Sequence, residues 1–199
     1  CVEVCPATDP ANRNRKAINM DDKELILQKE KKNIDFFEDI PWNDRSKIDF
    51  STVHGAQFLE PLFEFSGACA GCGETPYLKL LSQLFGGRLL VANATGCSSI
   101  YGGNLPTTPW AKNKDGRGPA WSNSLFEDNA EFGLGMRITA DKQLAVARQL
   151  LLQLKEELGE EYVKEILDAP QTLESELVTQ HQRIDGLKAK LKEMKSSTA

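Results

Sequence analysis

Apolar residues recur at helical spacing in the middle of the chain. Thr75 and Pro76 supply a helix N-cap and a proline suited to the first turn, and Gly86-Gly87 is suited to ending a helix. The apolar positions between these signals lie mostly three or four residues apart: Tyr77, Leu80, Leu81, Leu84 and Phe85. This pattern predicts a helix that begins at Thr75-Pro76 and ends at Gly86-Gly87.

The residues that follow have the pattern of an open α/β sheet. The run 88–93 is short and largely apolar, which predicts a buried strand, and the small residues of 94–99 predict a turn. Residues 100–120 are rich in Gly, Pro, Asn and Thr, which is typical of a long functional loop. A helix, a strand and a small-residue turn in this order favour the α/β class, in which ligands gather at the carboxyl ends of strands.

Helix is predicted to dominate from Trp121 onward, with Pro170 separating two apolar stripes. The first stripe contains Leu144, Val146, Ala147, Leu150, Leu151 and Leu154. The second contains Leu173, Leu177, Ile184, Leu187, Leu191 and Met194. The second stripe fits a helical hairpin or short coiled coil, and it also fits an amphipathic helix packed on its own domain, which we favour. Residues 21–50 are charged and are predicted to form a helix followed by an extended connector.

Composition excludes several classes of protein. The chain has 199 residues, 40% of them apolar, and a net charge of -5, which is typical of a globular protein and unfavourable for a nucleic-acid surface or membrane attraction. No apolar run approaches the ~20 residues that span a bilayer. The first residue is Cys1 rather than Met, so we expect the chain to begin within a longer sequence.

Three cysteines form the most informative pattern. Cys69 and Cys72 lie in one glycine-rich loop, and Cys97 follows the predicted strand. Two thiolates three residues apart can hold one metal centre, and a third would complete three corners of a tetrahedral sulfur site. The spacing leaves an iron–sulfur cluster, a zinc half-site and a redox dithiol open. Glu74, two residues after Cys72, could stabilise the helix N-terminus or contact a cofactor.

The first residues favour the iron–sulfur interpretation. Cys1 and Cys5-Pro6 match the end of the bacterial ferredoxin motif, so one chain carries parts of two cluster motifs. Lys114-Asp115-Gly116 is similar to the start of a diphosphate–magnesium motif but lacks its first glycine, so a turn is the better interpretation.

The block 63–103, together with 118–128, closely resembles the pyruvate:ferredoxin (flavodoxin) oxidoreductase family, and the resemblance runs from Cys1 to about Arg148. It implies a remnant of a two-cluster ferredoxin-like domain at 1–20 and a linker at 21–58. Residues 59–199 would then be the first part of a thiamine-diphosphate-binding domain, an open α/β sheet with a large helical portion.

The same resemblance implies roles for individual residues. Cys69, Cys72 and Cys97 would be three ligands of the [4Fe–4S] cluster nearest the thiamine, and Glu74 and Cys97 would be neighbours of thiamine diphosphate itself. Cys1 and Cys5 would ligate the ferredoxin-type [4Fe–4S] clusters. The fourth ligand of the proximal cluster and the segment that binds Mg2+ and diphosphate lie outside this chain.

The implied parent enzyme decarboxylates pyruvate oxidatively, transfers the acetyl group to coenzyme A and passes electrons to ferredoxin or flavodoxin. It would be a cytoplasmic homodimer of anaerobic metabolism, and the present chain alone would be inactive. Two alternatives stay open at this point: a non-catalytic iron–sulfur or zinc-stabilised electron-transfer module, and an oxidoreductase for a different 2-oxo acid.

Overall fold

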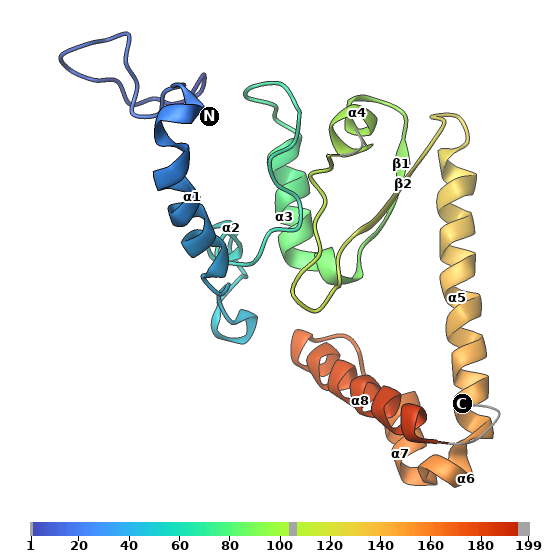
Figure 1. The fold of residues 1–199 in the computed structure, drawn as a ribbon. Helices are drawn as coiled ribbons and strands as arrows, with labels where there is room; N and C mark the ends of the chain where they lie inside the picture. The colour runs from blue at the N-terminus through green and yellow to red at the C-terminus, as the bar shows by residue number, and fades with distance from the viewer. Residues whose placement is uncertain (1, 104–106, 195–199) are drawn as a thin grey trace. The chain divides into compact units, whose positions relative to one another are not determined.

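The computed structural model describes residues 2–103 and 107–194, which divide into two compact units on either side of the bond between Gly133 and Leu134 (Figure 1). The N-terminal unit contains α1 (Lys23–Asp39), η1 (Arg45–Lys47), α2 (Val53–Ala56), α3 (Thr75–Phe85), η2 (Gly86–Arg88), β1 (Leu90–Ala94), α4 (Cys97–Gly103) and β2 (Ala120–Ser124). Helix α5 (Asn129–Gln153) crosses the boundary, and α6 (Lys155–Leu158), α7 (Glu160–Leu167) and α8 (Glu174–Glu193) complete the C-terminal unit. None of the described helices combines the length and the apolar composition that crossing a membrane requires.

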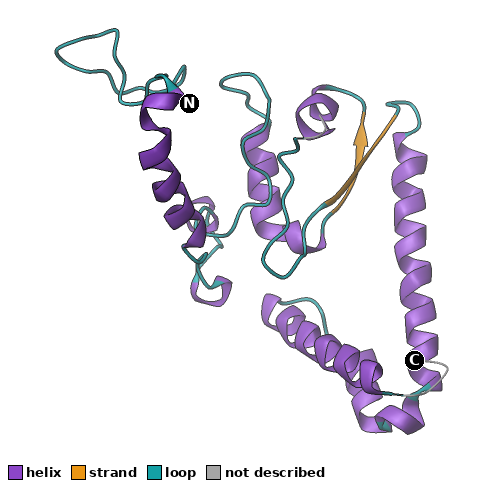
Figure 2. Cartoon of the chain, viewed as in Figure 1, coloured by secondary structure: helices purple, strands orange, loops and turns teal. Residues whose placement is uncertain are grey.

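Strands β1 and β2 pair in parallel, with Leu90 opposite Ala120 and Ala94 opposite Ser124 (Figure 2). The α/β class and the first strand are therefore confirmed. Helix dominates after Trp121, as predicted, except that residues 120–124 form β2, a strand that the sequence pattern did not predict. The run Ala-Trp-Ser-Asn-Ser has little apolar alternation, so its strand conformation comes from pairing with β1 rather than from local preference. The thiamine-domain and linker boundaries stay predictions.

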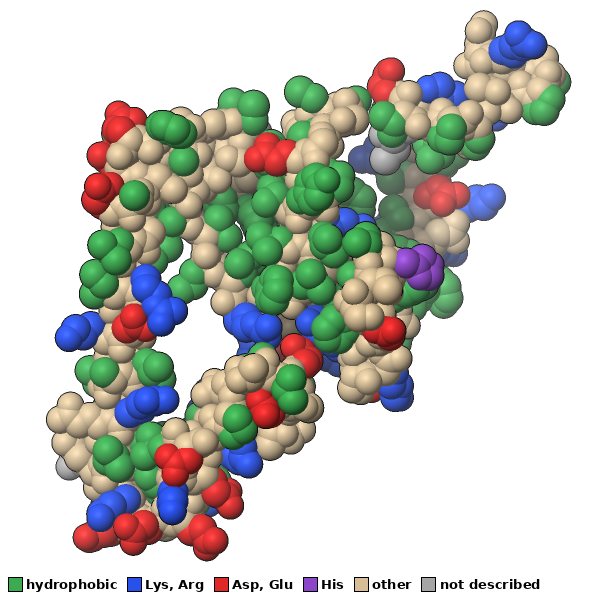
Figure 3. Space-filling model, turned by 180° about the vertical axis from the view of Figure 1, so that it is seen from behind, with side chains coloured by type: hydrophobic (Ala, Val, Ile, Leu, Met, Phe, Trp, Pro, Cys, Tyr) green, Lys and Arg blue, Asp and Glu red, His purple; other side chains and the backbone are tan. Residues whose placement is uncertain are grey.

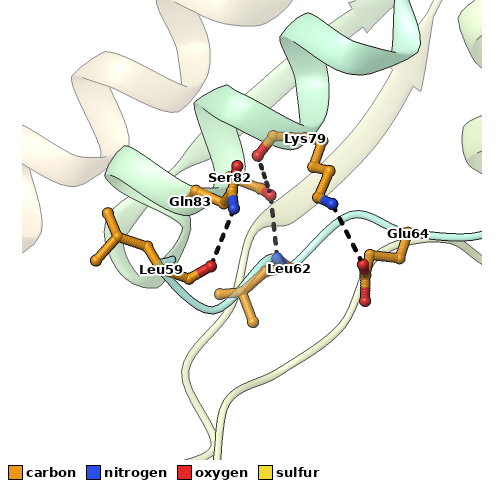
Figure 4. A network of polar contacts seen from close by, with 6 residues as sticks. All are labelled: Leu59, Leu62, Glu64, Lys79, Ser82 and Gln83. Carbon is orange, nitrogen blue, oxygen red and sulfur yellow. Dashed lines mark hydrogen bonds and ion pairs between the residues drawn. The ribbon is translucent and has the colours of Figure 1, made fainter. Parts of the chain in front are cut away.

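Polar contacts fix the segment that leads into the cysteine loop onto α3 (Figure 4). The amide of Leu62 donates to Ser82 Oγ at 3.0 Å, and Gln83 Nε2 donates to the carbonyl of Leu59 at 3.0 Å. Lys79 and Glu64 form an ion pair at 3.6 Å on the same side of the helix. Ser82 and Gln83 are buried, so these bonds satisfy backbone groups that water does not reach.

The long loop after α4 is held at its centre by the same segment. Phe63 and Trp110 form an antiparallel bridge, and the centroids of their aromatic rings lie 4.6 Å apart. The neighbouring amide of Glu64 donates to the carbonyl of Pro109 at 2.9 Å. The following residues form a turn in which Gly116 N donates to Asn113 O at 2.9 Å. The interpretation of Lys114-Asp115-Gly116 as a turn is therefore confirmed.

The region between α1 and the cysteine loop is attached to α3 as well. The guanidinium of Arg45 donates to the carbonyls of Gln83 at 2.8 Å and Leu84 at 2.9 Å, and it lies 4.5 Å from the ring centroid of Phe50. Arg45 thus satisfies carbonyls in the last turn of α3, which have no partners within the helix. Helix α1 was predicted, and it contains no buried residue.

The C-terminal unit has its own apolar core. Gln180 Nε2 of α8 donates to the carbonyl of Ile166 in α7 at 2.9 Å, and the Tyr162 hydroxyl donates to Arg183 O at 2.9 Å. The last helix therefore packs within its own unit, as the favoured interpretation predicted. The buried core residues are Leu151, Leu154, Leu158, Val163 and Ile166, with Ile184, Leu187, Leu191 and Met194 packed against them.

Gly118 allows a close approach between two backbone segments. A Cβ at this position would overlap the Ala111 carbonyl oxygen and lie 3.1 Å from Lys112 Cα. We predict that Gly118→Ala lowers the free energy of unfolding by about 1–3 kcal/mol, measured by urea unfolding, because backbone must move to admit the methyl group. Gly87→Ala is the matched control, since a Cβ at Gly87 would meet no atom within 4 Å. Equal stability of the two variants would contradict the prediction.

Candidate functional site

The loop that carries Cys69 and Cys72 is a tight turn. The amide of Cys72 donates to the carbonyl of Cys69 at 3.0 Å, and Gly71 between them has a φ of 74°. A positive φ at the third position of such a turn favours glycine, because other residues are strained there. The thiol of Cys69 is exposed, and that of Cys72 is partly buried.

Backbone amides at the start of α3 point to the sulfur of Cys72. Hydrogen bonding from the amides of Glu74 and Thr75 lowers the pKa of the Cys72 thiol below its usual value. The helix begins at Thr75, with Glu74 as N-cap residue and no side-chain cap, so the sequence-based placement of the cap at Thr75 is wrong by one residue. The uncapped amides thus favour the thiolate, which is the form that binds metal.

Cys97 is the first residue of α4, directly beyond the carboxyl end of β1. A network of amides and hydroxyls fixes this turn: Asn93 Nδ2 donates to Asn123 Oδ1 at 2.9 Å, and Ser99 Oγ donates to the same oxygen at 2.8 Å. The amide of Gly96 donates to Ser99 Oγ at 3.0 Å. The side chain of Asn123 in β2 therefore holds the residues on both sides of Cys97.

A second group of contacts closes the same edge of the sheet. Thr95 Oγ1 donates to the Ser124 carbonyl at 2.7 Å, and Asn123 Nδ2 lies 3.2 Å from Thr95 Oγ1. The side-chain nitrogen of Asn129, at the start of α5, lies 2.8 Å from Ser124 Oγ and 3.2 Å from the carbonyl of Ala92. The sequence pattern gave no sign of these residues, because their arrangement depends on β2, a strand that the pattern of apolar positions does not predict.

The buried hydroxyl of Tyr101 is influenced by three of the predicted site residues. Its side chain is 5% exposed, and its hydroxyl has no hydrogen-bond partner of good geometry among the described residues. Burial raises its pKa most, and a polar contact with Glu74 and the charges of Glu74, Cys72 and Cys97 raise it further. Glu74, Cys72 and Cys97 therefore lie within electrostatic reach of one buried hydroxyl. No sequence signal identified Tyr101.

The described residues contain no group of three His, Cys, Asp or Glu side chains close enough to hold a metal ion. The charges of Cys72 and Cys97 both raise the pKa of the Tyr101 hydroxyl, and the thiols of Cys69 and Cys97 are both exposed. The donor chemistry suits an iron–sulfur cluster, because thiols and a sulfur-directed pair of amides are present. The assignment of Cys69, Cys72 and Cys97 as ligands of one cluster stays a prediction.

The ferredoxin-like motif shows the same preference for thiolate. Cys5 is partly buried, and backbone hydrogen bonds from Ala7 and Ile18 lower the pKa of its thiol. Cys1 lies outside the described residues. A Cβ on Gly71 would lie 3.9 Å from Val4 Cγ1, so the side chain of Val4 lies near the loop of Cys69 and Cys72. The two cysteine motifs are neighbours in this structure.

Comparison with known proteins supports the resemblance. The chain is 56% identical over all 199 residues to a protein named "Putative pyruvate-flavodoxin oxidoreductase" from Synechocystis, of which it covers 17%. It is 59% identical over 96% of its length to "Pyruvate-flavodoxin oxidoreductase" from Trichormus variabilis, of which it covers 16%. It is 52% identical over 72% of its length to "Pyruvate:ferredoxin oxidoreductase" from Moorella thermoacetica, of which it covers 12%. No protein-family model matches the chain.

The network around Asn123 predicts a measurable effect on stability. Asn123→Ala removes two acceptor contacts and one donor contact, and we expect the free energy of unfolding to fall by about 1–2 kcal/mol. The rate at which a thiol reagent modifies Cys97 should rise, because its turn loosens. Ser122→Ala is the control, since Ser122 lies on the same strand, is exposed, and has no side-chain hydrogen bond to any residue that the structure describes. Asn123→Ala with the stability and thiol reactivity of that control would refute the role of this network.

Proposed function

Because this chain is homologous to a segment of pyruvate-flavodoxin oxidoreductase, we propose that it is part of an enzyme that oxidatively decarboxylates pyruvate. Electrons would pass through [4Fe–4S] clusters to flavodoxin or ferredoxin, and coenzyme A would receive the acetyl group. The observation that carries the proposal is 56% identity along the whole chain. The chain spans about a sixth of the length of the curated relatives it matches, so the rest of the machinery lies elsewhere.

Thiamine diphosphate, when bound with Mg2+, would supply the chemistry that releases CO2 from pyruvate, and the clusters would carry single electrons. Cys69, Cys72 and Cys97 would hold the proximal cluster. The amides at the start of α3 keep Cys72 ready to ligate as a thiolate. Glu74 would bind or orient the thiamine cofactor, and its polar contact with the buried Tyr101 hydroxyl would help to position that carboxylate.

Exposed apolar surface supports the view that further protein covers the N-terminal unit. Phe65 is 95% exposed, Tyr77 74% and Phe126 77%, and Figure 3 shows apolar side chains spread over the visible face. Exposed apolar surface on this scale is typical of regions that contact other protein. In the complete enzyme these side chains would contact its remaining domains or the second subunit of a cytoplasmic homodimer. The Mg2+ ligands and the fourth cluster ligand would come from the downstream part of the same polypeptide.

The proposal predicts that the 199-residue chain alone lacks activity. Because three predicted ligands of the proximal cluster and no diphosphate clamp are present, pyruvate-dependent dye reduction should not exceed that of a protein-free control. The full-length enzyme, assayed anaerobically with thiamine diphosphate and Mg2+, is the positive control. Pyruvate-dependent turnover by the isolated chain would overturn this assignment of missing parts.

A ligand substitution tests the cluster in the full-length enzyme. Cys72→Ala should lower iron and acid-labile sulfide by one cluster per chain, and pyruvate-dependent flavodoxin reduction should fall at least about 100-fold. Ala70→Ser is the control, since it lies in the same turn without supplying a thiol. Loss of about one zinc ion without loss of sulfide would instead identify the zinc-stabilised module. Unchanged iron, sulfide and activity would exclude Cys72 as a ligand.

A further inference from the structure

Phe65 combines two unfavourable features. Its φ is 54°, in the left-handed region, and among the described residues it is the only one other than glycine with a positive φ. Its side chain is also 95% exposed. A bulky residue is strained in this conformation, because its Cβ lies too close to a backbone carbonyl oxygen. Strain of this kind persists only where the surrounding structure or a function requires it.

The segment before Phe65 shows what the positive φ changes. This segment is paired with the long loop after α4, and the amide of Glu64 donates to Pro109 O at 2.9 Å. Phe63 in the paired segment is buried, with 2% of its surface exposed. In a continued strand the side chain two residues later would lie on the same face as Phe63. The turn at Phe65 instead leaves its ring in solvent.

The loop that follows Phe65 is uncovered. A Cβ added at Gly67 or at Gly73 would meet no atom within 4 Å. A glycine at position 65 could make the same turn without strain, because it has no Cβ. An aromatic ring at this position adds backbone strain and gains no burial among the described residues. We therefore expect the contact that compensates for both to lie outside them.

We propose that Phe65 is a docking anchor, whose ring inserts into an apolar pocket on the part of the same polypeptide that lies outside residues 1–199. The inference rests on the proposed function, which makes this chain a segment of a longer enzyme. The chain covers 17% of its Synechocystis relative, so most of such a polypeptide is available to supply the pocket. A pocket on the same polypeptide is tethered at high effective concentration, whereas a second copy has to associate from solution.

The backbone conformation makes Phe65 an effective anchor. A ring that is already held outward loses little conformational freedom on binding, so more of its hydrophobic burial contributes to docking. Glu64, directly before it, is held by its ion pair with Lys79 at 3.6 Å. Docking at Phe65 would therefore fix the start of the loop that carries Cys69 and Cys72 relative to the rest of the enzyme.

The first test places the photoreactive amino acid p-benzoylphenylalanine at position 65 of the full-length enzyme. After irradiation, the main cross-link should join position 65 to a peptide of the same polypeptide outside residues 1–199. Mass spectrometry identifies that peptide, and denaturing electrophoresis should show no doubling of the mass. The control is the same probe at Lys114, an exposed polar residue in a turn, where no cross-link is expected.

Limited proteolysis of the full-length enzyme separates the role of the ring from that of the strain. Phe65→Ala and Phe65→Gly should both be cleaved about tenfold faster within residues 59–74, because each loses the ring and the loop opens more often. Phe65→Leu keeps an apolar side chain and should be cleaved at nearly the wild-type rate. If Phe65 were only strained, Phe65→Gly would relieve the strain and slow the cleavage.

The outcomes decide both the role and the partner. A cross-link that doubles the mass would overturn the choice of the same polypeptide, since the second copy would then cover Phe65. No cross-link, cross-links confined to residues 1–199, or equal cross-linking at Lys114 would overturn the docking role. Cleavage of Phe65→Gly no faster than the wild type would do the same, and cleavage of Phe65→Leu as fast as Phe65→Ala would contradict an apolar pocket.

The proposed function is measured separately, by pyruvate-dependent flavodoxin reduction in the wild-type enzyme. Failure of that reaction would refute the proposed function and leave the cross-linking result at position 65 intact. A wild-type enzyme that reduces flavodoxin but gives no cross-link from position 65 would refute only the role of Phe65.

Discussion

Parallel hydrogen bonding between β1 and β2 brings together side chains that lie 30 positions apart in the sequence, as the contact of Asn93 with Asn123 shows. Both strands end at the same edge, so the turn that carries Cys97 and the polar side chains that hold it are built from two distant segments. Tyr101 follows on α4 and lies within electrostatic reach of Cys72 and Glu74 from the other cysteine loop. Without this strand pair, nothing would fix the turn of Cys97 relative to the loop that carries Cys69 and Cys72.

The local sequence pattern was sufficient to predict the elements whose own residues favour the conformation that they adopt. The helix over Thr75–Phe85, the strand at Leu90–Ala94 and the last helix at Glu174–Glu193 follow apolar spacing and breaker residues. Local pattern failed at Ala120–Ser124 and at Cys97–Gly103, where small and polar residues have weak preferences of their own. In both places the conformation depends on partners far away in the sequence. The local spacing of apolar residues does not indicate which distant segments will pair, so it could not predict these elements.

The candidate site divides in the same way. Cysteine spacing identified the loop of Cys69 and Cys72 and the turn of Cys97, because a ligand type and its spacing are properties of the sequence itself. The amides that favour the Cys72 thiolate follow from the position of the first turn of α3, which was predicted to within one residue. The roles of Tyr101 and Asn123 could not be predicted, since an aromatic residue and an amide gain a role here only through burial and cross-strand contact.

The two cysteine motifs share one electrostatic arrangement, although they come from different parts of the chain. At both Cys5 and Cys72 the largest influence on the thiol is a backbone hydrogen bond, which favours the thiolate without adding a charged side chain. Amide dipoles cannot move away as a side chain can, so their stabilisation of negative charge persists when the redox state of a bound cluster changes. The side chain of Val4 in the first motif lies near Gly71 in the turn of the second. The two motifs therefore favour the thiolate form of their cysteines by the same physical means, although they lie in different parts of the sequence.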